Sequence, residues 1–218
     1  MNTLNKIYFI VGFMVFLSTV ASGDMITIEP DAFADGTDIS TAFSSVTLSS
    51  HDSAWPYRID GSVYARTASN PLHASTGTKI FGTNATGTDS EGNPLNESWI
   101  NYGPMDYWIF CAHFNDLANY VSIDVINNDG INSDVGELSV WDAGSNFLGQ
   151  VWDSVSGRGT SSTLVFNSSS FDIAYIEFKG TSSVAIDNFK ANVVPVPGAM
   201  LLGMLGLGAA GLKLRKFA

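Results

Sequence analysis

The sequence contains a single cysteine, Cys111, among its 218 residues. One cysteine cannot form an intrachain disulfide, which excludes the disulfide-stapled class of small secreted domains. Cys111 stands in the apolar run 108–112, where a thiol typically packs as a small hydrophobic group. We therefore predict a buried, structural cysteine in a fold that is stabilised by its core.

Basic residues are also scarce, with 10 Lys and Arg against 21 Asp and Glu. Lys6 and three basic residues after position 212 lie outside residues 24–194, whereas every acidic residue lies inside that range. Six basic residues against 21 acidic ones give the middle part a formal charge of −15. A surface of this sign repels nucleic acid, suits solubility outside the cell and attracts divalent cations.

Motifs typical of catalysis are absent from the sequence. The three histidines, His51, His73 and His113, are scattered without metal-ligand spacing, and no nucleophile elbow, zinc-protease motif or phosphate loop occurs. The sequence therefore predicts no enzyme and no catalytic residue. A glycan-active hydrolase stays open as the alternative, because its two carboxylates can come from distant strands.

The N-terminal segment has the pattern of a secretory signal peptide, predicted over residues 1–23. Lys6 precedes an apolar run over residues 7–17, and small residues follow up to Gly23. The run is short for a membrane span, which needs about 20 apolar residues. Cleavage after Ala21 and cleavage after Gly23 both fit, and an uncleaved N-terminal anchor is the alternative.

The C-terminal segment, residues 194–218, has three parts. Two prolines near its start disfavour helix and strand pairing, which leaves an extended strip for a protease. The glycine-containing apolar run 198–212 can enter a membrane but is marginal in length. A basic stop then holds the C-terminus on the cytoplasmic side, and it consists of Lys213, Arg215 and Lys216.

This segment resembles the PEP-CTERM sorting signal of exported proteins from exopolysaccharide-producing Gram-negative bacteria. The residues that match its motif are Val194, Pro195, Val196, Pro197, Gly198 and Ala199. The resemblance implies an exosortase-type membrane protease as partner, transient anchoring in the inner membrane, and delivery to the cell surface or extracellular matrix. The usual motif has Glu where Val196 stands, which leaves the type of exosortase open. The alternative is a plain membrane anchor that is never cut, although glycines make a poor anchor helix.

Residues 24–193 are predicted to form one all-β domain. Helical periodicity is nearly absent there, and short apolar or alternating runs are separated by Gly, Asn, Asp and Ser. The predicted strands cover residues 25–28, 45–48, 62–65, 79–82, 109–114, 121–126, 136–142, 147–153, 163–166, 173–178 and 184–189. Such a series predicts a two-sheet antiparallel β-sandwich of jelly-roll type.

Residues 136–153 predict a β-hairpin around the turn 143–146. The expected register pairs Asp142 with Phe147, Trp141 with Leu148, and Glu137 with Trp152. It places five residues on the face away from the core, namely Glu137, Ser139, Trp141, Gln150 and Trp152. Aromatic rings beside amides and carboxylates suit stacking against sugar rings, so this face is a predicted glycan-binding site. The alternative is that both tryptophans pack under a loop.

The order of features also resembles galactose-binding-like jelly-roll domains. The matching residues are 36–40, 121–126, 128–130, 138–144 and 184–189. The resemblance implies a structural calcium ion that joins an early loop to the last strand, here Asp35 or Asp38 with Asp187. Carboxylates and loop carbonyls are suitable ligands for calcium, but the same residues also form ordinary Asx turns.

Together these features predict a non-enzymatic secreted or surface-associated protein. We expect it to be associated with the exopolysaccharide or biofilm matrix and to bind glycan, with no nucleic-acid partner. A secreted hydrolase and a purely structural surface protein are the rival functions.

Overall fold

The computed structural model describes residues 23–52, 60–84, 101–102, 106–128, 133–180 and 184–194. Apart from Gly23 and Val194, the predicted signal peptide and sorting segment lie outside these residues. Asp24–Val193 is a compact unit. Within the described ranges, no helix has the length and hydropathy that crossing a bilayer requires.

The described elements are β-strands and two short 3-10 turns. In chain order they are β1 (Asp24–Ile28), η1 (Pro30–Ala32), β2 (Val46–Asp52), β3 (Asp60–Gly61), β4 (Tyr64–Thr67), η2 (Pro71–His73), β5 (Lys79–Gly82), β6 (Asn101–Tyr102), β7 (Asp106–Asn127), β8 (Ser133–Trp141), β9 (Phe147–Ser156), β10 (Ser161–Asn167), β11 (Ile173–Gly180) and β12 (Val184–Val193). Each predicted strand overlaps one of these strands, and the overlap is smallest for residues 62–65, of which only Tyr64 and Ala65 lie in β4.

The long strand β7 joins two predicted strands, 109–114 and 121–126, into one of 22 residues. The segment between them, residues 115–120, contains several polar residues that suggest a break in the strand, but it continues the strand in the structure. The first half of β7 pairs with β2 and β11, and its second half pairs with β10 and β12. One strand therefore belongs to two sheets.

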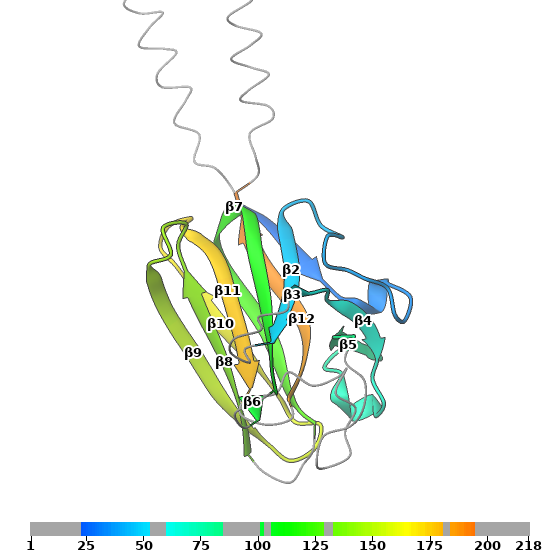
Figure 1. Cartoon of the computed structure of the whole chain (residues 1–218). Coiled ribbons are helices and arrows are strands. Elements are labelled where there is room, and N and C mark those ends of the chain that lie inside the picture. Colours follow the sequence, from blue (N-terminus) through cyan, green and yellow to red (C-terminus); the bar gives the residue numbers. More distant parts are fainter. Residues whose placement is uncertain are drawn as a thin grey trace, which may run out of the picture. The chain divides into compact units, whose positions relative to one another are not determined.

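The first sheet has the order β3-β2-β7-β11-β8-β9, and the second has the order β4-β5-β12-β7-β10 with β1 beside β12. All of these pairs are antiparallel. The two sheets pack into an antiparallel β-sandwich of jelly-roll type, which confirms the predicted fold class (Figure 1).

The core between the sheets contains a cluster of phenylalanines. The ring centroids of Phe81 and Phe110 lie 5.3 Å apart, and those of Phe110 and Phe189 lie 5.9 Å apart. These rings pack edge to face or tilted, which adds to the free energy of burying their apolar area. Cys111, on the same strand as Phe110, is also buried, as its apolar neighbours predict.

Candidate functional site

The outward face of the first sheet carries three rows of side chains that run across β7, β11, β8 and β9. Residues two apart on a strand point to the same face, so the rows lie about 7 Å from each other. The strand pairing defines a first row of His113, Tyr175, Trp141 and Phe147, a second row of Cys111, Glu177, Ser139 and Gln150, and a third row of Lys179, Glu137 and Trp152.

The first row is a continuous line of aromatic rings. The Tyr175 ring has its centroid 4.4 Å from that of His113 and 5.2 Å from that of Trp141. Trp141 in turn meets Phe147 edge to face, with centroids 5.7 Å apart. The last ring of the line, Phe147, is 56% exposed. The row thus offers aromatic surface to solvent along the width of four strands.

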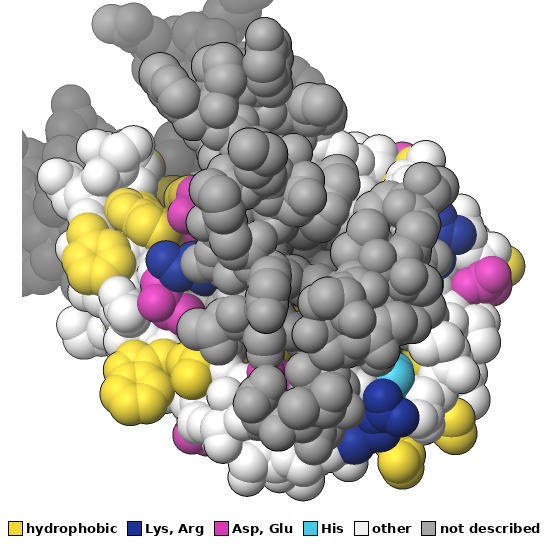
Figure 2. Space-filling model, turned by 60° about the horizontal axis from the view of Figure 1, so that its bottom comes forward, with side chains coloured by type: hydrophobic (Ala, Val, Ile, Leu, Met, Phe, Trp, Pro, Cys, Tyr) yellow, Lys and Arg dark blue, Asp and Glu magenta, His cyan; other side chains and the backbone are white. Residues whose placement is uncertain are grey.

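An open hollow of about 580 Å³ lies over this row. Its lining residues are His113, Phe114, Trp141, Asp142, Ala143, Ser145, Ala174, Tyr175 and Glu177. Figure 2 shows large hydrophobic side chains protruding beside acidic and basic ones at the margin of the face seen there. The hollow therefore combines aromatic surface with polar groups at its rim.

The tyrosine at the centre of the row is held in its neutral form. Burial raises the pKa of the Tyr175 phenol, and the neighbouring Cys111 and Glu177 raise it further. The Tyr175 hydroxyl donates a hydrogen bond to Oε1 of Glu177 and lies 3.4 Å from the sulfur of Cys111. These contacts fix the orientation of the ring that stacks between His113 and Trp141.

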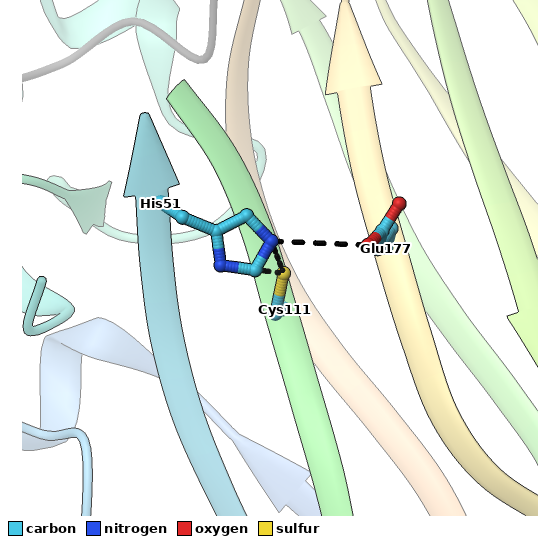
Figure 3. Close-up of side chains that lie close together, drawn as sticks. All are labelled: His51, Cys111 and Glu177. Carbon is cyan, nitrogen blue, oxygen red and sulfur yellow. Dashed lines mark hydrogen bonds and ion pairs between the residues drawn. The ribbon is translucent and has the colours of Figure 1, made fainter. Parts of the chain in front are cut away.

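A second group of polar side chains lies next to this hollow, on three adjacent strands. His51 on β2, Cys111 on β7 and Glu177 on β11 place their ligand atoms within 4.8 Å of one another (Figure 3). Nε2 of His51 lies 3.1 Å from the sulfur of Cys111 and 3.8 Å from Oε1 of Glu177. Of the described His, Cys, Asp and Glu residues, only these form such a group of three.

The five predicted glycan-binding residues all lie on this face, in its first, second and third rows. Trp141 lines the hollow, and Trp152 stands in the third row with 65% of its surface exposed. Glu137 forms an ion pair of 2.8 Å with Lys179 and accepts a hydrogen bond from Ser139. The predicted pair Glu137–Trp152 is present, and Leu138 and Val140 lie in the core.

The register at the hairpin end differs from the predicted one. Trp141 pairs with Phe147 instead of Leu148, because a bulge shifts the pairing between Val140 and Trp141. The predicted pair of Asp142 with Phe147 is therefore wrong. The bulge places Phe147 against the Trp141 ring, which extends the aromatic row to the edge of the sheet.

Sequence reasoning missed His113, Tyr175 and Glu177. The alternation of Tyr175, Glu177 and Lys179 with the buried Ile176 and Phe178 does mark an outward face on β11. What the alternation does not reveal is that β11 lies between β7 and β8, because that neighbourhood comes from the topology.

Asp35 and Asp38, the two alternative calcium ligands of the early loop, each hold a backbone N–H group. Asp35 accepts a hydrogen bond from the backbone N–H of Thr67, and Asp38 accepts one from the backbone N–H of Ser40. These hydrogen bonds lower the pKa of both carboxyls, although burial opposes them and is the largest single influence at Asp38. The bond from Asp38 to Ser40 is of the Asx-turn kind. Calcium binding stays a prediction.

Asp187 instead anchors the loop that follows η2. Its Oδ2 accepts hydrogen bonds from the backbone N–H groups and the hydroxyls of Ser75 and Thr76, and its Oδ1 accepts one from the N–H of Asn188. Burial raises the pKa of this carboxyl, while the hydrogen bonds oppose the shift. The same two hydroxyls also bond to Asp124 and Glu29, so three carboxylates hold one loop.

No protein-family model and no curated protein matches the sequence. Among solved structures, the chain is similar to the K2 cleaved adhesin domain of Lys-gingipain, with 10% identity, a TM-score of 0.45, and coverage of 78% of this chain and 100% of that one. The K1 cleaved adhesin domain of Lys-gingipain from Porphyromonas gingivalis W83 gives 12% identity, a TM-score of 0.45, and coverage of 78% and 99%. A xylan-binding domain from carbohydrate-binding module family 22 gives 12% identity, a TM-score of 0.37, and coverage of 75% and 96%.

Proposed function

We propose that this is a non-enzymatic glycan-binding protein of the cell surface or extracellular matrix. The single observation that carries the proposal is the aromatic row of Tyr175, Trp141 and Phe147 beside an open hollow. Sugar rings present C–H groups on their faces, and these groups stack favourably on aromatic rings. The polar groups at the rim of the hollow are suitable partners for sugar hydroxyls.

The exposure of the third row supports a binding role over a purely structural one. A structural surface protein predicts that both tryptophans are buried, whereas Trp152 is 65% exposed. Trp141 and Trp152 lie four strand positions apart along the sheet, which corresponds to roughly 13 Å. That span suits a chain of several sugar units better than a single monosaccharide.

The carboxylates of the hollow are engaged in ways that favour binding over hydrolysis. Glycoside hydrolysis needs one carboxyl to protonate the leaving group and a second to act as nucleophile or base. Asp142 accepts hydrogen bonds from Gly144 and Asn146 in the hairpin turn, and Glu177 accepts one from Tyr175. Each carboxylate is thus already used to hold the structure of the site.

We further propose that the protein is exported and processed by an exosortase-type system, with transient anchoring in the inner membrane. The two terminal segments described in the sequence support this proposal, and the −15 charge of the middle part suits a protein that works outside the cell. Mass spectrometry of the mature protein in its host tests both ends at once. An intact first methionine with an intact C-terminus would contradict export and processing.

The glycan proposal is tested with the full-length chain in mild detergent on an array of neutral and acidic polysaccharides. We expect saturable binding to at least one polysaccharide, without release of reducing ends. Trp141→Ala should weaken that binding at least tenfold, whereas Met25→Ala, which removes an exposed hydrophobic side chain from β1, should not change it. No binding to any polysaccharide would reject the proposal, and release of reducing ends would favour the hydrolase.

A further inference from the structure

The group of His51, Cys111 and Glu177 is a second feature of the first sheet, and only its member Glu177 also lines the hollow. The three residues come from β2, β7 and β11, which are neighbours in the sheet. Cys111 is completely buried and His51 is 4% exposed, whereas the side chain of Glu177 is 28% exposed toward the hollow. We propose that these three side chains form a binding site for a zinc ion.

The ligand types are those that zinc prefers. Zinc binds thiolate sulfur, imidazole nitrogen and carboxylate oxygen, whereas calcium and magnesium select oxygen ligands alone. The sulfur of Cys111 and the imidazole of His51 therefore favour zinc over calcium or magnesium. The thiolate, the imidazole and the carboxylate fill three of the four positions around a tetrahedral zinc ion. The fourth position is left for water, for the Tyr175 hydroxyl or for another ligand.

The spacing of the ligand atoms is close to that of a tetrahedral zinc site. With Zn–S near 2.3 Å and Zn–N and Zn–O near 2.0–2.2 Å, neighbouring ligand atoms in a tetrahedron lie roughly 3.3–3.6 Å apart. Nε2 of His51 lies 3.1 Å from the sulfur and 3.8 Å from Oε1 of Glu177. These two distances lie within a few tenths of an ångström of the tetrahedral values, and all the ligand atoms lie within 4.8 Å of one another.

Charge balance suits a divalent cation at this place. Zinc binds thiolate sulfur, so the Cys111 thiol would lose its proton when the ion binds. One thiolate, one carboxylate and a neutral imidazole then carry two negative charges, which a zinc ion neutralises. Glu177, the partly exposed member of the group, also lines the hollow.

Tyr175 is a positioning residue for this site. Its hydroxyl donates to Glu177 and contacts the sulfur of Cys111, so it orients two of the three ligands. Partners of metal ligands of this kind contribute about 10-fold to 100-fold to metal affinity. Loss of the hydroxyl should therefore weaken the metal site while the ring remains in the aromatic row.

The experiment is a titration of the full-length chain, stripped of metal, with Co²⁺ as a spectroscopic probe and Zn²⁺ as its competitor. We expect one equivalent of Co²⁺ to give a thiolate-to-cobalt charge-transfer band and the intense visible bands of tetrahedral cobalt, and one equivalent of Zn²⁺ to remove both. Cys111→Ser and His51→Asn should weaken Zn²⁺ binding at least about 100-fold, and Tyr175→Phe should weaken it about tenfold. Zn²⁺ should also raise the melting temperature of the wild type.

The control is Asp24→Asn, which removes an exposed carboxylate of β1 outside both the hollow and the group of three. It should leave the cobalt spectrum unchanged. Absence of the charge-transfer band in the wild type, or a band that persists in Cys111→Ser, would overturn the proposal. Because the wild-type titration and the Zn²⁺-dependent melt need no variant, the proposal stays testable even if a variant fails to fold.

The metal site does not rest on the proposed glycan binding, and the two can fail separately. Trp141→Ala should weaken glycan binding at least tenfold and keep the cobalt spectrum. Cys111→Ser should abolish the spectrum and keep glycan binding. Glu177 lines the hollow as well as the metal group, so Glu177→Gln is expected to change both.

Discussion

Tyr175 on β11 and Trp141 on β8 face each other across a strand pair, with their ring centroids 5.2 Å apart and their planes at 40°. The two residues lie 34 positions apart in the sequence, so the pairing of β8 with β11 brings their rings together. The pair joins the His113 side of the row to the Phe147 side, so the aromatic surface depends on both rings.

The first prediction concerns this pair. Trp141→Ala removes the ring that contacts both Tyr175 and Phe147 and should reduce glycan affinity at least tenfold, which corresponds to about 1.4 kcal/mol. Tyr175→Phe keeps the ring and should leave glycan affinity within about twofold. Isothermal titration with the polysaccharide selected on the array measures both values. Equal losses in the two variants would show that the hydroxyl, and not the ring, contributes the binding.

The second prediction concerns the pH dependence of the β8–β9 turn. The side-chain amide of Asn146 and the N–H groups of Asn146 and Gly144 hold the pKa of Asp142 below its usual value of about 3.9. A carboxyl whose pKa is lowered by folding stabilises the fold above its unfolded pKa, and this contribution is lost as the pH falls through the folded value. The wild type should therefore melt above Asp142→Asn at pH 7, and the difference should shrink below about pH 4.

The control for this prediction is a double-mutant cycle with Asn146→Ala. Because Asn146→Ala removes the side-chain amide hydrogen bonds to Asp142 and keeps the one from the backbone N–H, Asp142→Asn should cost less in the Asn146→Ala background than in the wild type. A difference between wild type and Asp142→Asn that is constant from pH 7 to pH 3 would contradict the assignment.

The third prediction concerns Gly136, a buried residue of β8. A methyl group there would come within 2.7 Å of both methyls of Val125 and 3.1 Å of the Phe178 ring. Gly136→Ala should therefore reduce the free energy of unfolding by about 1–3 kcal/mol, as overpacking of a core does. Urea denaturation measures the loss. Ser133→Ala, an exposed change on the same strand, should stay within about 0.5 kcal/mol of the wild type.

The fourth prediction tests the calcium ion expected from the sequence. If calcium binds the folded state, its addition to chelator-treated protein should raise the melting temperature, and Asp187→Asn should reduce that rise. Calcium and zinc are added separately, so that the effect is not confused with the proposed zinc site. Asp24→Asn on β1 is the matched control, since it removes an exposed carboxylate. An unchanged midpoint would reject the calcium site.

The sequence predicted the local parts of the fold well and the non-local parts poorly. The pairing of Glu137 with Trp152 follows from a short turn and alternating hydrophobicity, both of which are local signals. The bulge beside Val140 was not predicted, although its partner Gly149 is a glycine inside a strand, which is a position where bulges often occur. Likewise, His51 and Cys111 are 60 residues apart and come together only because β2 pairs with β7.

The pairing of β1 with β12 has a mechanical consequence. Asp24 at the start of β1 lies opposite Val193 at the end of β12, so the domain's two ends emerge side by side. A force that pulls these two ends apart breaks the β1–β12 hydrogen bonds one pair after another, and it therefore meets little resistance. A domain that is held through only one of its ends carries no load between the two, so its β1–β12 ladder is not pulled apart in this way.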